Sequence, residues 1–425
     1  MTFHLESARR LLLALMSCVA AAAAPAAAQK PWRITLGRED SLDIGMIHNA
    51  PNGHISYQTK DRLTLWVDGR VYGNATGPKS KANSTQGTFI LHPASWSIPD
   101  LQRASAVNVY HGVHDATLPC TADSAWYRDY AAINSIIPGP TPGQLLAFVD
   151  GEFHPLHTGN PLRASIGVAT STDGVTWVNR RVIVQGNDIV AAKFNCGSVD
   201  ATMKTRADNE GAAGPSAVVR SEGNTKYIYL YYLDRVRLQP NQKPTSDIYV
   251  ARALYAGGGA PGTWQFWTGK GWSGPGAEAI AKPVVTTPAG GGEAAHPQVT
   301  YNTALKRWLM IFHSRADLYA TSSEDGTTWD TPQALGASTR GARSPAFPTL
   351  VTPTAADQQT TGDSGMLFYS REVTGAGPNA NNVYLGFVRS FTVTTTPGGV
   401  RKPPCGTPRD CCEANGGTWS GGRCG

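Results

Sequence analysis

The 425-residue sequence has little charge, and that charge is dispersed. Charged residues make up 16% of the chain and the formal net charge is +6. No cluster of lysine and arginine is spaced as it would be along a groove for nucleic acid. Because nucleic-acid affinity depends on many phosphate contacts, this composition argues against a nucleic-acid-binding protein.

Long apolar runs are confined to the N-terminus. Residues 1–28 combine Arg9 and Arg10, an apolar stretch and the small residues 26–28, which is the pattern of a secretory signal peptide. A Leu-Met-Ser-Cys sequence ending at Cys18 could instead be a lipoprotein box, but the alanine run after it fits ordinary cleavage better. No later run approaches membrane-spanning length. We expect a secreted or periplasmic bacterial protein without a membrane span, and a monomer.

Cysteine is scarce outside the C-terminus. Of the seven cysteines, Cys18 belongs to the signal sequence, which leaves an even number in an exported chain and favours disulfides. Four crowd the tail over residues 399–425, namely Cys405, Cys411, Cys412 and Cys424. The two adjacent cysteines would each pair with one of the outer two, and Cys120 would pair with Cys196. A zinc site is the competing interpretation, but the tail has no histidine and no Cys-x2-Cys knuckle.

Convincing helical periodicity is absent, and short strands take its place. Runs of a few residues rich in Val, Ile, Tyr and Phe are bounded by Gly, Pro and Asn, a composition typical of strands and turns. The high content of glycine (46) and proline (29) agrees with many short strands. The runs fall into five blocks, at about residues 48–101, 105–186, 210–285, 293–338 and 342–396.

One heptapeptide recurs with two differences. Residues 171–177 read Ser-Thr-Asp-Gly-Val-Thr-Trp, and residues 323–329 read Ser-Glu-Asp-Gly-Thr-Thr-Trp. Asp-Gly after a strand predicts a tight turn, because glycine accepts a positive φ and the aspartate can accept hydrogen bonds from the turn backbone. The closing tryptophan is large enough to pack between sheets. Such a repeat, within five blocks, predicts an all-β, five-bladed β-propeller over residues 29–398.

Three of the blocks open in the same way. Gly214-Pro215, His296-Pro297 and Phe347-Pro348 each lead into an apolar strand. In a propeller the first strand of each blade lines the central channel. The residues just before these strands are therefore expected to converge on one mouth of that channel.

Two passages resemble the five-bladed propeller glycosidases, the clan of arabinanases, xylosidases and fructosidases. Gly214-Pro215 with residues 226–232 is similar to the clan's Glu-Gly-Pro … Tyr-Tyr-Leu passage, and residues 171–177 are similar to its Ser-x-Asp-Gly-x-x-Trp hairpin. The resemblance implies a secreted glycoside hydrolase acting on a polysaccharide or oligosaccharide. One carboxylic acid would protonate the leaving oxygen, and one carboxylate would activate water or attack the sugar. No cofactor is required, although calcium or another cation could bind in the channel.

The expected catalytic residues are acids near the starts of blades. Glu210 is the expected general acid, Asp43 or Asp115 the expected base, and Glu293 a further candidate. Ala212 and Ala213 separate Glu210-Gly211 from Gly-Pro, which departs from the clan's spacing. Asp68, followed by Gly69, is interpreted as a turn residue.

Ala50 raises an alternative to catalysis. Residues 48–53, His-Asn-Ala-Pro-Asn-Gly, resemble the Asn-Asp-Pro-Asn-Gly nucleophile motif of the fructosidase branch, with Ala50 in the place of the nucleophile. The chain would then have either a differently built site or no catalytic site at all, as a carbohydrate-binding propeller. A metal-dependent hydrolase of another ester or lactone is a third hypothesis, because propellers support many chemistries.

The expected substrate-binding residues come from loops near these acids. Trp126 is expected to stack on a sugar ring. Two acids and two histidines within residues 150–157 could bind sugar hydroxyls or a cation, although we assign no metal-ligand set. The full set of predicted substrate-binding residues is Trp126, Asp129, Glu152, His154, His296 and Arg343.

Overall fold

The computed structural model describes a part of the chain that consists of residues 31–45, 47, 54–72, 84–111, 125–127, 130–153, 163–186, 210–236, 245–286, 293–314, 317–337, 345–373, 383–395, 419–420 and 423–424. The chain divides into two units, one formed by Ile34–Thr394 and one by both ends, Met1–Arg33 with Thr395–Gly425. In the second unit, β22 (Trp419–Ser420) pairs antiparallel with β23 (Arg423–Cys424). The signal sequence and most of the cysteines lie outside the described residues, so the leader and the disulfides stay predictions.

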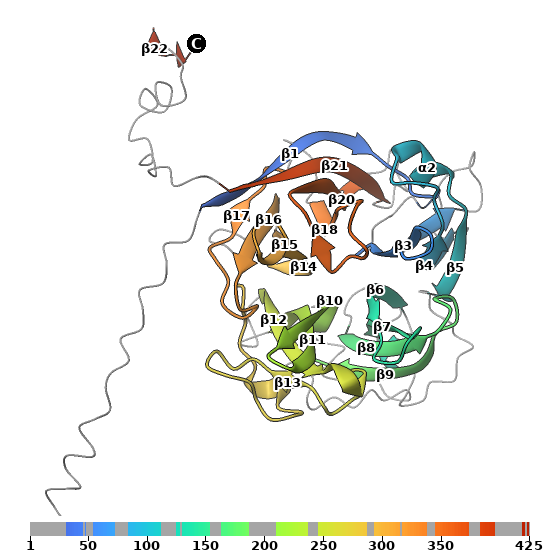
Figure 1. Ribbon diagram of the computed structural model, residues 1–425, viewed down its shortest axis with the longest axis vertical. Coiled ribbons are helices and arrows are strands. Elements are labelled where there is room, and N and C mark those ends of the chain that lie inside the picture. The colour runs from blue at the N-terminus through green and yellow to red at the C-terminus, as the bar shows by residue number, and fades with distance from the viewer. Residues whose placement is uncertain are drawn as a thin grey trace, which may run out of the picture. The chain divides into compact units, whose positions relative to one another are not determined.

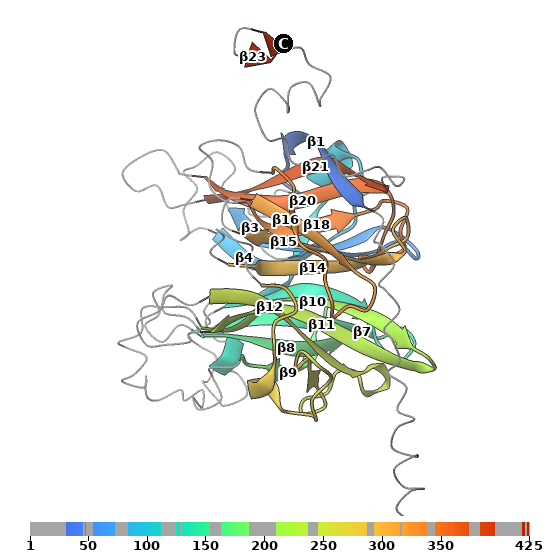
Figure 2. The same ribbon diagram turned by 90° about the vertical axis from the view of Figure 1, so that its left-hand side faces the viewer.

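Strands are the main secondary structure of the larger unit and its helical segments are short (Figure 1 and Figure 2), which confirms the predicted all-β class. Its strands are β1 (Trp32–Ser41), β2 (Ser56–Gln58), β3 (Thr64–Tyr72), β4 (Ser84–Leu91), β5 (Ala106–His111), β6 (Tyr130–Pro138), β7 (Leu145–Phe153), β8 (Arg163–Ser171), β9 (Val178–Val184), β10 (Glu210–Glu222), β11 (Thr225–Val236), β12 (Thr245–Leu254), β13 (Gln265–Phe266), β14 (Ala295–Asn302), β15 (Arg307–Ser314), β16 (Asp317–Ser323), β17 (Gln333–Ala334), β18 (Pro345–Val351), β19 (Thr360–Thr361), β20 (Ser364–Val373) and β21 (Val383–Thr395). Its helical segments are α2 (Ile98–Arg103), η2 (Ala125–Tyr127), η3 (Tyr255–Gly257) and η4 (Glu278–Ile280). Among the described residues, no helix has the length and apolar character needed to cross a membrane.

Pairing arranges these strands in successive groups of four. The groups are β2–β5, β6–β9, β10–β13, β14–β17 with β19 beside β14, and β18-β20-β21 with β1. A short parallel pairing of β8 with β10 joins the second and third groups into one eight-stranded sheet. Figure 1 shows β6, β10, β14 and β18 toward the middle of this unit, and β5, β9, β13 and β17 on its outside.

Two strand assignments from the sequence were wrong. Ala106–His111 (β5) pairs with β4 and completes the first group, so it does not open the second block. Trp32–Ser41 (β1), which lies outside all five predicted blocks, is the outer strand of the last group, next to β21. Local composition carries no signal for strand partners that are distant in sequence. For this reason the sequence did not predict the pairing of β1 or of β5.

An ion pair fixes β1 to the last group. Arg371 in β20 is almost fully buried, and its guanidinium donates to both carboxylate oxygens of Glu39 at 3.0 and 2.8 Å. Tyr369 also donates its hydroxyl to Glu39, and Arg371 donates to the carbonyl of Ala337 at 2.9 Å. The strands from the two ends of this unit are therefore held in one sheet.

A closed ring of hydrogen bonds connects the inner strands of the five groups. In each bond, a buried side chain on one inner strand accepts a backbone N–H from the next group. The bonds run from Ile136 to Ser56 (3.1 Å), Ala217 to Ser135 (3.0 Å), Val299 to Ser216 (3.0 Å), Leu350 to Gln298 (3.2 Å) and Ile55 to Thr349 (3.2 Å). The fifth bond returns to the first group and closes the ring.

The two Asp-Gly turns form as predicted. The Asp173 carboxylate accepts the N–H groups of Val175 and Thr176 at 2.8 and 2.7 Å, and Gly174 has a φ of 72°. Asp325 and Gly326 repeat this arrangement, with a φ of 71° at the glycine. Each glycine carbonyl also accepts a hydrogen bond from an aromatic side chain of the preceding group, Trp66 at 2.8 Å and Tyr231 at 2.9 Å. The turns therefore join neighbouring groups as well as neighbouring strands.

Removing one hydroxyl from the ring should destabilise the fold. Ser216→Ala leaves the Val299 N–H without an acceptor in a buried position, and we expect the free energy of unfolding to fall by about 1–3 kcal/mol. Ser221→Ala, at an exposed position on the same strand, is the matched control and should change stability by less than about 0.5 kcal/mol. Urea denaturation of both variants measures the difference. Equal stability of the two variants would contradict the role of the ring.

Candidate functional site

The starts of the inner strands gather at one end of the larger unit. In β6, β10, β14 and β18 a break in strand register immediately precedes the ring residue. The residues before these breaks therefore lie on the same side of the ring. A set of buried or half-buried ionisable side chains collects there, and we call it the acid–histidine cluster. Its members are His54, Asp150, Glu152, Arg235, His296 and His313.

The predicted Gly-Pro, His-Pro and Phe-Pro pairs form these breaks. Gly214, His296 and Phe347 all have a left-handed backbone, with φ values of 59°, 49° and 54°. This conformation is costly for His296 and Phe347, because their Cβ atoms crowd the backbone there. At residue 214 only glycine fits, since a Cβ there would lie 2.9 Å from Cδ2 of His296. The repeated bulge thus brings side chains of neighbouring groups against one another.

Three histidines of the cluster are uncharged at neutral pH. Burial lowers the pKa of His54 and His313 to about 4 and holds that of His296 well below its ordinary value, and the positive charge of Arg235 adds to the effect on His296 and His313. The His296 and His313 rings stack with centroids 4.9 Å apart and Nδ1 atoms 3.3 Å apart, so one ring donates and the other accepts. His54 donates from Nδ1 to the Pro348 carbonyl at 3.1 Å.

Asp150 is a buried acid that favours its protonated form. Burial, and then the neighbouring Glu152, raise its pKa to about 8, while a hydrogen bond from the Gly214 N–H and the charge of Arg235 act in the opposite direction. Its Oδ1 is buried and has no hydrogen-bond partner in the described part of the chain. Because Asp150 and Glu152 are two residues apart on β7, their side chains leave the strand on the same face.

Asp68 corrects a prediction from the sequence. It does not lie in a turn but in the interior of β3, opposite Thr88, and it is fully buried. Its Oδ2 accepts a hydrogen bond from the Tyr130 hydroxyl at 2.6 Å, and Tyr130 pairs across strands with Glu152. The Asp-Gly doublet suggested a turn, and only strand pairing shows that this aspartate belongs to the interior.

Several predicted residues lie at this end of the unit. Glu210 is the first residue of β10 and pairs with Arg163 of β8. Glu293 is half-buried two residues before β14, and Glu152 and His296 belong to the cluster itself. The structure therefore places Glu152 of the second group and the start of β10 in the third group at the same end of the unit. Asp115, Asp129, His154, Arg343 and Ala50 lie outside the described residues, and their roles stay predictions.

Trp126 is enclosed and not exposed to a ligand, and Asp43 lies beside β21 and α2. Asp43 is half-buried on a segment held by backbone hydrogen bonds to outer elements, from Leu42 to Gly386 of β21 and from Gly45 to Leu101 of α2. Trp126 is 1% exposed, and its ring fills the space that Cβ atoms would need at Gly151 and Gly167. An enclosed ring has no open face for a sugar, so Trp126 packs the strands.

The chemistry available in the cluster is that of proton transfer and neutral hydrogen bonding. It offers a protonated carboxyl group, a second carboxyl group, three neutral imidazoles and one guanidinium. Among the described residues, no group of three or more His, Cys, Asp or Glu side chains could hold a metal ion. Neutral imidazole nitrogens and a buried acid suit an uncharged polyhydroxylated ligand, which both donates and accepts hydrogen bonds.

The raised pKa of Asp150 predicts how stability depends on pH. Between about pH 4 and pH 8 the native chain binds more protons at this carboxyl than the unfolded chain does, so its stabilising contribution is complete below this window and is lost as the pH rises through it. We expect a loss of up to about 1.4 kcal/mol per pH unit from this group. Asp150→Asn should flatten the slope, and Asp40→Asn, at an exposed position on β1, should not. Denaturation at several pH values checks this, and parallel slopes for wild type and Asp150→Asn would contradict it.

Comparison with known proteins gives distant structural similarities. No family model and no curated protein matches the chain. A GH62 hydrolase in complex with xylotriose has a TM-score of 0.46 and 8% identity, over 85% of this chain and 98% of that one. An N-acetylgalactosamine deacetylase from F. plautii, in complex with blood group B trisaccharide, has a TM-score of 0.44 and 11% identity, over 84% and 95% of the two chains. An α-L-arabinofuranosidase from Lactobacillus brevis has a TM-score of 0.42 and 13% identity, over 80% and 91%. The resemblance to glycosidase structures is therefore present, but it is remote, and the function has to be argued from this chain's own residues.

Proposed function

We propose that this chain is a secreted glycoside hydrolase that cleaves a polysaccharide or oligosaccharide at the acid–histidine cluster. The observation that carries the proposal is that Asp150, a buried carboxyl group with a raised pKa, lies next to Glu152 on the same face of β7. Glycosidic bond cleavage requires two carboxyl groups, one of which has to carry a proton. Several neutral hydrogen-bonding groups surround them, which favours an uncharged substrate.

Glu210 is the proposed general acid, and Asp150, which favours its protonated form, is the alternative acid. Glu152 joins Asp43 and Asp115 as a candidate base. Glu152 pairs with Ala164 of β8, and Ala164 pairs with Gly211 of β10. Two strand spacings place the backbones of Glu152 and Gly211 about 10 Å apart. This backbone separation is comparable with the ~5–9.5 Å between the two carboxyl groups of glycosidases. The reaction needs no cofactor, and a cation in the channel would be structural.

The architecture that we propose for this site is a five-bladed propeller. The five groups of four strands, the closed ring of hydrogen bonds and the pairing of β1 in the last group support it. Each group would be one blade, and the ring would surround the channel. Export by the N-terminal leader and a disulfide-bonded tail complete the proposal.

Replacing Glu210 tests the mechanism. Glu210→Gln removes the proton but keeps the size of the side chain, so we expect hydrolysis to fall by about 10²–10⁴-fold. Glu324→Gln is the control, because that side chain is 78% exposed and belongs to β16–β17, away from the cluster. Reducing-sugar release from arabinan, xylan, inulin and levan and their oligosaccharides is the measurement. Unchanged hydrolysis of every accepted glycan would remove Glu210 from the mechanism.

A carbohydrate-binding protein without catalysis is the second candidate, and Ala50 favours it. A glycan array, run beside the release assay on the wild-type chain, separates the two candidates. Binding of a glycan with no release of reducing sugar from it would support the binding protein. Release that depends on Glu210 would support the hydrolase.

A further inference from the structure

We propose that the larger unit has a second carbohydrate-binding site, a groove at the end opposite the acid–histidine cluster that holds a segment of an uncharged linear glycan. The inference rests on the proposed function for its ligand class, but it depends on different residues. The groove would anchor the polymer, while cleavage would take place at the cluster.

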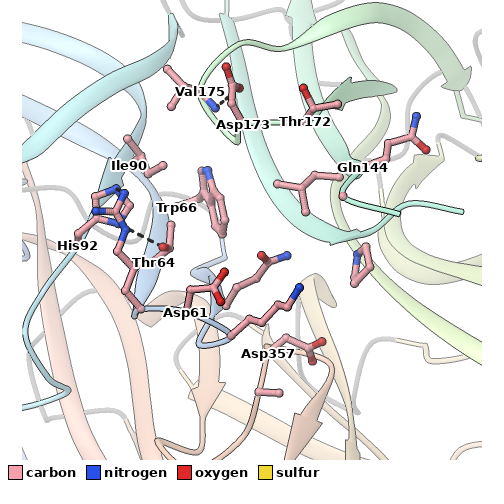
Figure 3. A pocket seen from close by; sticks show the side chains of 17 residues that line it. Asp61, Thr64, Trp66, Ile90, His92, Gln144, Thr172, Asp173, Val175 and Asp357 are labelled. Carbon is pink, nitrogen blue, oxygen red and sulfur yellow. Dashed lines mark hydrogen bonds between the residues drawn. The ribbon is translucent and has the colours of Figure 1, made fainter. Parts of the chain in front are cut away.

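The groove consists of two adjoining cavities. One has a volume of about 590 Å³ and the other about 550 Å³, and Ile90, His92 and Val175 line both. Volumes of this size are typical of small-molecule sites, and two cavities in a row suit an extended ligand more than a compact one. Figure 3 shows the first cavity, with Trp66, Ile90 and His92 from the first group facing Gln144 and Asp173 from the second.

The groove is remote from the cluster. It is lined by the turns between β2 and β3, between β6 and β7, and between β8 and β9. Leu145 lines it at the start of β7, whereas Glu152 lies near the other end of that strand. At about 3.3 Å per residue, the backbones of these two residues are roughly 23 Å apart. A ligand in the groove would therefore leave the cluster open.

The polar wall of the groove is pre-organised. Arg62 donates to Nε2 of His92 at 3.0 Å, so the imidazole proton lies on Nδ1, which donates to the Thr64 hydroxyl at 3.2 Å. The Thr64 hydroxyl keeps its own proton, and Arg62 keeps further N–H groups, for a ligand. Burial and the Arg62 charge both lower the pKa of His92, which keeps this network in one protonation state at neutral pH.

The charges and the apolar wall favour an uncharged sugar over an anion. Lys60 and Arg62 share the first cavity with three acids, Asp61, Asp173 and Asp357, so the cavity has no excess of positive charge that would bind a phosphate or a polyanion. Val175, which is 43% exposed, projects where the two cavities join. Alternating apolar and hydrogen-bonding groups match the faces and hydroxyls of successive sugar residues.

Trp66 fixes the part of the wall that carries Val175. Its indole is 3% exposed, so it is not itself a stacking surface. It donates Nε1–H to the Gly174 carbonyl at 2.8 Å, and Asp173 accepts the Val175 N–H. The Asp-Gly turn, which the sequence marks as architecture, therefore also positions the contact residue of the proposed groove.

Polysaccharide retention tests the groove with matched variants. Val175→Asp and Arg62→Ala change exposed groove residues, whereas Val178→Asp changes a 50% exposed valine on β9 that lines neither cavity. We expect wild type and Val178→Asp to be retained on at least one of insoluble arabinan, xylan, inulin and cellulose, and the two groove variants to bind about five- to tenfold more weakly. Thermal unfolding of all variants confirms that each is folded.

Hydrolysis of soluble oligosaccharides distinguishes the two sites. The groove variants should hydrolyse a short accepted oligosaccharide at the wild-type rate, and Glu210→Gln should keep wild-type retention on the polymer. If wild type releases no sugar but shows retention that depends on Val175 and Arg62, the proposed hydrolase fails and the groove stands. Equal retention of the groove variants and Val178→Asp, or no retention of wild type on any of the four polymers, would overturn the groove.

Discussion

The ring of hydrogen bonds between inner strands is the constraint on which the rest of the structure depends. The buried N–H group of each bond reaches its acceptor only if the neighbouring inner strand keeps its position and its register. Because the Thr349 hydroxyl accepts the Ile55 N–H, the last group has to lie beside the first. A shift of one inner strand would therefore leave buried N–H groups without acceptors. The ring thus converts five separate groups into one unit with a defined inner surface.

The same constraint brings the cluster together. A register break just ahead of the ring residue turns the backbone, and at Gly214, His296 and Phe347 it does so through a left-handed residue before proline. That strain is tolerated because the ring and the strand pairing over-determine the conformation. Its product is contact between side chains of neighbouring groups, with His296 against Phe347 at 4.2 Å between ring centroids.

Burial decides the electrostatics of the cluster. It is the largest cause of the shifts at Asp150 and at all three histidines, and in each case it favours the uncharged form. The result is a set of neutral donors and acceptors beside one guanidinium and the Glu152 carboxyl group, which can exchange water for sugar hydroxyls. A site for a phosphate or a carboxylate would need the opposite balance.

Sequence reasoning succeeded where local chemistry decides the structure. The Asp173 and Asp325 turns follow from the φ of glycine and the reach of one carboxylate. The three X-Pro pairs stand out as a shared pattern, although they lie at register breaks inside β10, β14 and β18 and do not begin these strands. It failed where distant pairing decides, at β1, at β5 and at Asp68, whose neighbour Gly69 gave the appearance of a turn. The sequence shows Asp150 and Glu152 as two nearby acids. The raised pKa of Asp150 comes first from burial, which only the folded sheet supplies.

The two ends of the larger unit depend on different parts of the sequence. At the turn end, Asp173 holds Val175 through bonds within a few residues, and Trp66 fixes the turn from one neighbouring group. At the cluster end, burial between the assembled groups raises the pKa of Asp150, while Gly214 and Arg235 from another group act in the opposite direction. Both effects require that the ring keeps the groups in register. Loss of register between groups should therefore disturb the cluster before it disturbs the individual turns. This asymmetry explains why the turns could be read from the sequence, whereas the acid pair required the assembled sheets.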